Sequence, residues 1–129
     1  MERTYIAATD RHSDFYRDLR AALRAAGVKL VDDPNDATAT FTISFDRTGQ
    51  RVLSVSARNV PTEFEVFYTI EYALDSDTQI LLESQVLTLT RDYTYDSTLV
   101  LGKAKEEALL REAIVEDLVS IVLKQISTL

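Results

Sequence analysis

Hydrophobic and polar residues alternate strictly over residues 37–46, a pattern typical of a β-strand with one buried side and one solvent-facing side. We expect the apolar side, which ends at Phe45, to face the core and the threonine-rich side, which ends at Asp46, to face solvent. A second alternating segment covers residues 63–74. Its apolar side consists of Phe64, Val66, Tyr68, Ile70, Tyr72 and Leu74. Both segments therefore predict half-buried strands.

Shorter segments between and after these two complete a predicted antiparallel meander. In chain order they are a turn at 47–50, a strand at 51–57, a turn at 75–78 and a strand at 79–93. Gly49 is expected to supply a positive φ in the first of these turns. The remaining connection covers residues 57–61 and places Arg58 at its centre.

The N-terminal part of the chain predicts a β-α-β unit. Residues 4–8 read as a short strand, and an amphipathic helix follows with Ser13 as its N-cap and Gly27 just after its last turn. A second short strand is predicted at 28–31, before an acidic loop at 32–36. A crossover of this kind makes its two strands parallel.

From about Asp96 to the end of the chain the apolar residues recur with helical spacing. The stripe consists of Leu110, Ile114, Leu118, Ile121, Val122, Ile126 and Leu129. Further apolar residues widen this arc, which either packs deeply on the sheet or meets a partner with part of its surface. The pattern as a whole predicts an α+β two-layer sandwich, a mixed and mostly antiparallel sheet with two helices packed on one face, forming a single domain over residues 1–129.

Composition narrows the possible functions. The chain has 129 residues, a net charge of −7 and no cysteine, which argues against nucleic-acid binding and excludes thiolate chemistry. It has no apolar run long enough for a transmembrane helix. His12 beside a serine and an aspartate cannot form a triad, since adjacent positions do not converge, and the 32–36 loop lacks calcium-site spacing. We expect no enzyme activity, metal or cofactor.

Two segments are locally basic although the chain is acidic overall. Residues 47–62 carry Arg47, Arg51 and Arg58 without any acidic residue. Lys103 and Lys105 lie at the expected start of the last helix, where a lysine opposes the helix dipole but a bound anion would be favoured. Each feature is either ordinary surface charge or part of an anion-binding site.

An ordered series of segments resembles the LptE family of lipopolysaccharide-assembly lipoproteins. The segments are LRAALRAAGVKLVD, SVSARNVPTEFEVFYTIEYAL and LTLTRDYTYDSTLVLGKAKEEALLREAIVEDLVSIVLKQI. They include a helix that ends in Gly-Val, an Arg-Asn strand junction and a lysine-rich entry to the last helix. Family members begin with a signal peptide and a lipidated cysteine, so we expect this chain to be the soluble part that follows such an anchor.

The resemblance implies a non-enzymatic role at the periplasmic side of the outer membrane. Such proteins plug and help assemble the LptD β-barrel in a one-to-one heterodimer, and they bind lipopolysaccharide through its lipid A phosphates. The family's basic positions correspond to Arg58 and Lys103, with Arg51 and Lys105 as possible additional contacts. The alternative is another periplasmic envelope-assembly module that binds a protein partner by strand addition, which a free edge on the 37–46 or 51–57 strand would favour.

Overall fold

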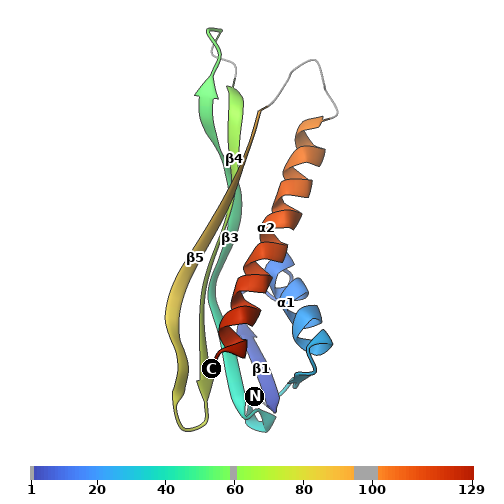
Figure 1. The fold of residues 1–129 in the computed structure, drawn as a ribbon, viewed down its shortest axis with the longest axis vertical. Helices are drawn as coiled ribbons and strands as arrows, with labels where there is room; N and C mark the ends of the chain where they lie inside the picture. The colour runs from blue at the N-terminus through green and yellow to red at the C-terminus, as the bar shows by residue number, and fades with distance from the viewer. Residues whose placement is uncertain (1, 59–60, 95–101) are drawn as a thin grey trace.

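The computed structural model describes residues 2–58, 61–94 and 102–129. Its elements in chain order are β1 (Arg3–Ala8), α1 (Asp14–Ala25), β2 (Lys29–Leu30), a 3-10 turn (Pro34–Asp36), β3 (Ala39–Val55), β4 (Pro61–Ser76), β5 (Ile80–Thr94) and α2 (Gly102–Ser127). The sheet order is β2-β1-β3-β4-β5. β1 pairs in parallel with β2 and β3, whereas β3, β4 and β5 pair antiparallel. Both helices cover one face of the sheet (Figure 1), which confirms the predicted fold class.

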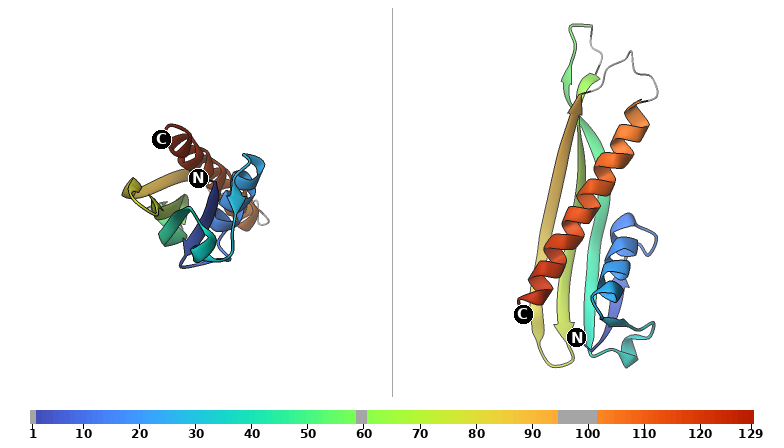
Figure 2. Two further views of the ribbon diagram at one scale, coloured as in Figure 1. Left: turned by 90° about the horizontal axis from the view of Figure 1, so that it is seen from below. Right: turned by 45° about the vertical axis from the view of Figure 1, so that its right-hand side comes forward.

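The molecule is elongated because β3, β4 and β5 are much longer than β1 and β2. Figure 2 shows α2 running along the sheet while α1 lies beside its lower half. The β3–β4 connection and the start of α2 lie at one end of the long axis, which we call the hairpin end. The half that contains β1, β2 and α1 is called the packed end.

The core lies between the inner face of the sheet and the two helices. The six predicted β4 residues are all buried, together with Phe15, Leu19 and Leu23 of α1. The C-terminal half of α2 contributes Ile114 and Leu118, each with no exposed surface. The alternation predicted for β4 is confirmed, and so is the amphipathic character of α1, although Ala26, which continues the helical spacing of Phe15, Leu19 and Leu23, follows the helix and is exposed.

The ends of α1 also follow the sequence prediction. The Ser13 side chain accepts a hydrogen bond from the backbone N–H of Tyr16, as an N-cap should. Gly27 has a φ of 89°, a conformation that favours glycine, and the backbone N–H of Val28 donates to the carbonyl of Leu23. The chain is thereby turned sharply from α1 into β2.

The turn predicted at residues 47–50 is wrong, because β3 runs without interruption through it. Gly49 pairs with Phe67 inside the β3–β4 ladder. A Cβ atom at residue 49 would lie 2.9 Å from Cζ of Phe67, so glycine serves here to admit an aromatic ring from the neighbouring strand. The predicted strands 37–46 and 51–57 are consequently parts of one long strand.

The predicted sides of Phe45 and Asp46 are also reversed. The β3–β4 register shifts between Ile43 and Phe45, and such an irregularity inverts the alternation beyond it. Phe45 is therefore 43% exposed, while Asp46 faces the helices. The C-terminal helix differs from its prediction too. Leu129 is exposed and follows the helix, and the expected start from Asp96 to residue 101 lies outside the described residues.

Candidate functional site

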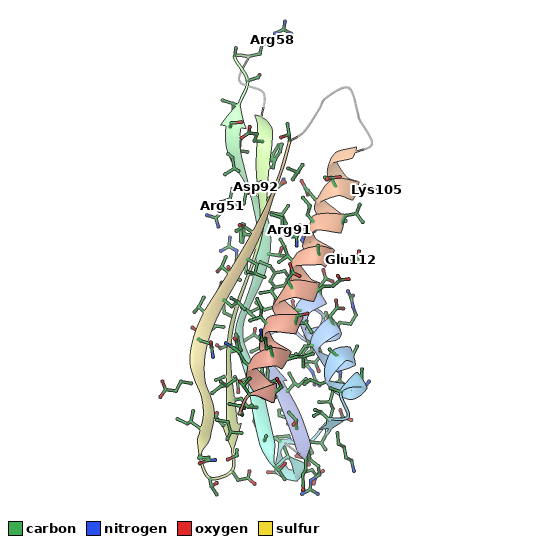
Figure 3. The ribbon with its side chains drawn as sticks, viewed as in Figure 1. Arg51, Arg58, Arg91, Asp92, Lys105 and Glu112 are labelled. Carbon is green, nitrogen blue, oxygen red and sulfur yellow. The ribbon has the colours of Figure 1, made fainter. Side chains whose placement is uncertain are left out.

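Arg58 lies in the turn between β3 and β4, at the outermost point of the hairpin end (Figure 3). Its side chain is exposed, and its backbone N–H donates to the Ser56 hydroxyl oxygen at 3.2 Å. The paired strands β3 and β4 fix where this turn begins and ends, and so they fix the backbone position from which the Arg58 side chain extends. The guanidinium is thus presented to solvent beyond the packed layers.

The first turn of α2 lies at the same end of the molecule as Arg58. Lys103 belongs to this turn, but its side chain lies outside the described residues. Lys105 is exposed, and Figure 3 shows it on the side of α2 that faces away from the sheet. The structure therefore brings the Arg58 turn and the start of α2 to one end, while the separation of the Arg58 and Lys103 side chains stays a prediction.

Arg51 has a different environment from the other predicted site residues. Its Nε atom lies 3.4 Å from Oε1 of Glu65, and its guanidinium carbon lies 4.6 Å from the centre of the Phe67 ring. Glu65 and Phe67 alternate with the buried residues of β4, so they lie on the face of the sheet that the helices leave open. Arg51 is accordingly held on the open face, away from α2 (Figure 3).

The basic strip read from residues 47–62 is partly neutralised by the neighbouring strand. Glu65 pairs with Arg51 and Glu63 with Ser54 in the antiparallel register. Glu65 is fourteen positions from Arg51 in the chain and is nevertheless its neighbour in the sheet. Because a carboxylate next to Arg51 offsets its charge, Arg58 is the more available cation of the strip.

A buried tyrosine connects the start of α2 to the sheet near this site. The Tyr93 hydroxyl donates to Oε1 of Glu107 at 2.7 Å and lies 3.2 Å from Oε1 of Gln50. Its ring stacks on Phe64 at 5.3 Å between centroids. Burial raises the pKa of Tyr93, and its hydrogen bond to Glu107 raises it further. The α2 residues that follow Lys103 and Lys105 are therefore tied to both β3 and β5.

Three further polar contacts hold α2 along the length of the sheet. Arg111 Nε donates to the Thr48 hydroxyl at 3.0 Å, and Arg91 of β5 donates to Oδ2 of Asp117 at 2.8 Å. The Tyr72 hydroxyl donates to Oε1 of Gln125 near the C-terminus. These contacts fix the rotation of α2 about its axis, which an apolar stripe alone would define loosely.

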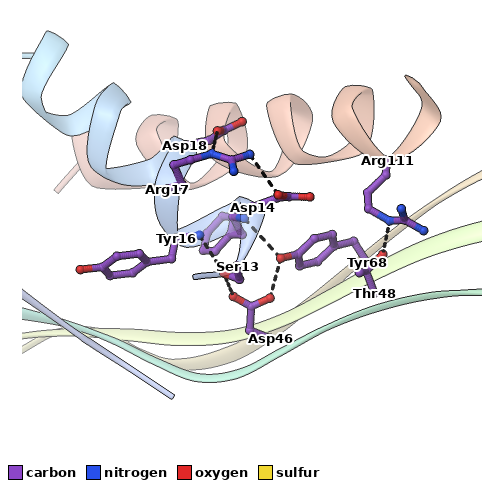
Figure 4. Close-up of polar contacts among 10 residues, drawn as sticks. Ser13, Asp14, Tyr16, Arg17, Asp18, Asp46, Thr48, Tyr68 and Arg111 are labelled. Atoms are coloured by element: carbon purple, nitrogen blue, oxygen red, sulfur yellow. Dashed lines mark hydrogen bonds and ion pairs between the residues drawn. The ribbon is translucent and has the colours of Figure 1, made fainter. Parts of the chain in front are cut away.

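The reversal at Asp46 builds a polar network that sequence reasoning missed (Figure 4). Asp46 accepts hydrogen bonds from the hydroxyls of Ser13 and Tyr68, the latter at 2.5 Å. The Tyr68 oxygen in turn accepts from the backbone N–H of Phe15 at 3.3 Å. Burial, followed by the hydrogen bond to Asp46, raises the pKa of Tyr68. This network attaches the start of α1 to the sheet, and the sequence held no signal for it because the strand irregularity decides where Asp46 points.

The described residues contain neither a metal-holding group nor a membrane-spanning helix. Across residues 2–58, 61–94 and 102–129, no group of three His, Cys, Asp or Glu side chains is placed to hold a metal ion. No helix in this part of the chain is long and apolar enough to cross a membrane. The charged groups of the hairpin end can bind an anion through ion pairs and hydrogen bonds.

Comparison with known proteins places these observations in a family. The profile of the LptE family, described as lipopolysaccharide-assembly, matches residues 1–126. No curated protein matches the sequence. The family profile therefore carries the assignment.

Solved structures share the fold over nearly the whole chain. A solution structure of uncharacterized lipoprotein B from Nitrosomonas europaea has a TM-score of 0.84 at 28% identity, and the match covers 98% of this chain and 82% of that one. Rare lipoprotein B from Shewanella oneidensis matches with a TM-score of 0.81 at 23% identity, covering 98% and 94% of the two chains. A minor lipoprotein from Acinetobacter baumannii gives 0.78 at 23% identity, covering 98% and 91%. At 23% identity the last two support the fold alone.

Proposed function

The chain belongs to the LptE lipopolysaccharide-assembly family, and from this premise we propose that it binds lipopolysaccharide at its hairpin end and plugs the LptD β-barrel. Members of the family act in outer-membrane biogenesis without catalysing a reaction. The proposal assigns the lipid A phosphates to Arg58 and Lys103. Lys105, on the outer side of α2, and Arg51, on the open face of the sheet, are proposed as additional contacts.

The observation that carries the proposal is the common position of the Arg58 turn and the first turn of α2. A guanidinium can bind a phosphate through two parallel hydrogen bonds, and a lysine adds a point charge. The first backbone N–H groups of α2, which have no partner within the helix itself, would also favour an anion. We propose that these three contributions act on one phosphate-bearing head group.

The net charge of −7 is compatible with a local anion site. At physiological salt, charges more than about 10 Å apart are largely screened from each other. Arg58 extends beyond the sheet, farther along the long axis than the labelled Arg51 and Asp92 (Figure 3). A polyanion can therefore be attracted by Arg58 at the tip of the hairpin end although the chain as a whole is acidic.

The open face of the sheet supports a place inside a polar barrel lumen. It carries threonines from three neighbouring strands, and the hydroxyls of Thr69 and Thr88 lie 2.8 Å apart on it. Thr40 and Thr42 share this face, because they alternate with the buried Phe41 and Ile43. Figure 2 shows an elongated molecule, a shape that could enter a barrel along its axis, and porin-like lumens are lined by polar residues.

Capture of lipopolysaccharide tests the assignment of the two basic residues. We expect Arg58→Gln and Lys103→Gln each to weaken binding about tenfold, because each removes a charge-assisted contact to phosphate. Arg47→Gln is the matched control, since it removes the same charge from an exposed position on β3. Equal capture by all variants would refute the site, and a uniform loss with the control would point to net charge instead.

Co-expression with the barrel tests the partner. We expect the chain and LptD to elute together in size-exclusion chromatography at a one-to-one ratio. The Arg58→Gln variant should still join the complex, because a plug contacts the lumen over much of its surface. Separate elution of the wild-type chain and the barrel would refute the plug function while leaving lipopolysaccharide binding to be judged by its own assay.

Strand addition to a partner is a second candidate function, and one observation favours it. Within the described residues, pairing of β3 with β1 stops at Ile43. The part of β3 from Phe45 to Val55 then has β4 as its paired neighbour, and its other edge is open. Such an edge can accept a partner strand. Amide hydrogen exchange in the complex would slow about tenfold along this segment if a strand were added, and would stay unchanged for a plug held by side chains.

A further inference from the structure

A group of arginines on the outer surface of α1 has no role in the lipopolysaccharide site. Arg11, Arg17, Arg20 and Arg24 line one shallow pocket of about 460 Å³ together with Tyr16. His12 lies at its rim, and the lining contains no acidic side chain. Four of the ten arginines in an acidic chain thus surround a single concave surface.

Two of these arginines converge on one phenol oxygen. Arg20 Nη1 donates to the Tyr16 hydroxyl at 3.0 Å, while Arg11 Nη2 and Nε lie 3.2 and 3.4 Å from the same atom. Both guanidinium carbons lie within 6 Å of the Tyr16 ring centre, at 5.8 Å for Arg11 and 5.5 Å for Arg20. Burial of the phenol opposes its ionisation, but the hydrogen bonds from Arg11 and Arg20 prevail and lower the pKa of Tyr16.

This arrangement brings Arg11 and Arg20 together although, among the described residues, no carboxylate lies within ion-pair distance of either guanidinium. Arg17 is paired with Asp14 at 3.0 Å and lies 3.6 Å from Asp18. Among the residues that the structure describes, Arg11, Arg20 and Arg24 form no ion pair. Two guanidinium groups that share one neutral oxygen repel each other and leave most of their donors unused. An anion placed between them would relieve the repulsion and accept those donors.

We propose that the α1 arginine pocket binds a phosphate group through Arg11, Arg20 and Arg24. A phosphate group spreads its negative charge over several acceptor oxygens, which suits several guanidinium groups better than a single carboxylate does. Because the pocket is open to solvent, the phosphate can belong to a lipid headgroup or to a small free molecule. Tyr16 holds two of the arginines in the required orientation before the anion arrives.

The pocket is separate from the site at the hairpin end. Figure 1 places α1 beside the lower half of the sheet, whereas Arg58 lies at the opposite extreme of the molecule. If Arg58 and Lys103 do not bind lipopolysaccharide, the proposal for the α1 arginine pocket still stands. If the pocket binds no phosphate, the proposal for the hairpin end still stands. The two sites are therefore tested with different variants.

The experiment titrates the whole chain with inorganic pyrophosphate by calorimetry and sediments it with vesicles of phosphatidylglycerol or phosphatidylcholine. The test variant is Arg11→Gln/Arg20→Gln. The matched control is Arg3→Gln/Arg47→Gln, which removes two charges from β1 and β3. Circular dichroism and thermal unfolding establish that both variants are folded.

We expect saturable pyrophosphate binding by the wild type, weakened about tenfold or more in the test variant and unchanged in the control. Added binding to phosphatidylglycerol vesicles, with none to phosphatidylcholine, would assign the phosphate to a lipid headgroup. Pyrophosphate binding alone would assign it to a free phosphate compound. Absence of pyrophosphate binding, or an equal loss in both variants, would overturn the proposal. Binding of polyglutamate in place of pyrophosphate would also overturn it, by assigning the surface to an acidic protein segment.

Discussion

The long elements β3, β4, β5 and α2 run through both the packed end and the hairpin end, yet the two ends differ in how much surface they bury. In β3, Phe41 has no exposed surface, whereas Val55 is 55% exposed. In α2, Leu118 is fully buried, whereas Leu110, on the same stripe nearer the hairpin end, is only partly buried. Long elements thus begin inside a core and continue beyond it. The packed end supplies stability, while the hairpin end is left with exposed surface that a ligand or partner can use.

Truncation of one leucine in each half of α2 tests this contrast most strongly. Leu118→Ala should lower the free energy of unfolding by about 2–5 kcal/mol, because it leaves a cavity in the core. The same change at Leu110, on the same stripe nearer the hairpin end, should cost less, about 1 kcal/mol, because that side chain is only partly buried. Chemical denaturation of both variants is the measurement. Similar losses would show that the two halves of α2 are equally important for stability.

Removal of the Tyr68 hydroxyl tests the polar attachment of α1 at the packed end. Tyr68→Phe should cost about 1–3 kcal/mol, because it leaves the Phe15 N–H without a partner and leaves the Asp46 carboxylate with Ser13 alone. Tyr5→Phe is the control, since the described residues provide its hydroxyl with no hydrogen bond. Thermal unfolding at neutral pH measures both. An unchanged melting temperature in Tyr68→Phe would mean that apolar packing alone holds α1.

Alkaline titration sharpens the same point. The pKa of Tyr68 is raised above its ordinary value of 10.0, so its contribution is fully present below pH 10 and is lost as the pH rises further. Unfolding free energy should fall in this range by up to about 1.4 kcal/mol per pH unit for this group. The slope should be smaller in Tyr68→Phe and unchanged in Tyr16→Phe, because the pKa of Tyr16 is lowered and its effect is complete by pH 10.

The smallest expected effect on stability is at the hairpin end. Arg58→Gln should change the free energy of unfolding by less than about 0.5 kcal/mol, because the side chain is exposed and lies in a turn. Denaturation at two salt concentrations measures it. A loss of more than about 1 kcal/mol would mean that Arg58 is a structural residue and would weaken its assignment to a ligand.

Local patterns in the sequence predicted the structure correctly where it depends only on residues within the same element. The amphipathic helix α1, the Ser13 cap and the Gly27 turn depend on neighbours in the chain, and all three are confirmed. Gly49 depends on Phe67 of the next strand, so its turn-like composition predicted a turn where the strand continues. The sides of Phe45 and Asp46 depend on a shift of register, which no local pattern encodes.

In the candidate site, too, features set by local sequence were predicted correctly, and features set by a neighbouring element were not. Arg58 was placed correctly at a strand junction, because Val55 and Pro61 bound the turn that contains it. The charge of Arg51 was overestimated, since its partner Glu65 comes from the adjacent strand. The α1 arginines have helical spacing in the sequence, but only the fold shows that Arg11 and Arg20 share Tyr16.

A double-mutant cycle on lipopolysaccharide affinity tests the central claim most directly. Affinities are measured for the wild type, Arg58→Gln, Lys103→Gln and the double variant under one salt condition. If both residues bind one lipid headgroup, their effects are coupled, and the double variant loses less than the sum of the two single losses by about 0.5 kcal/mol or more. Strictly additive losses, or losses from one residue alone, would contradict a shared phosphate site at the hairpin end.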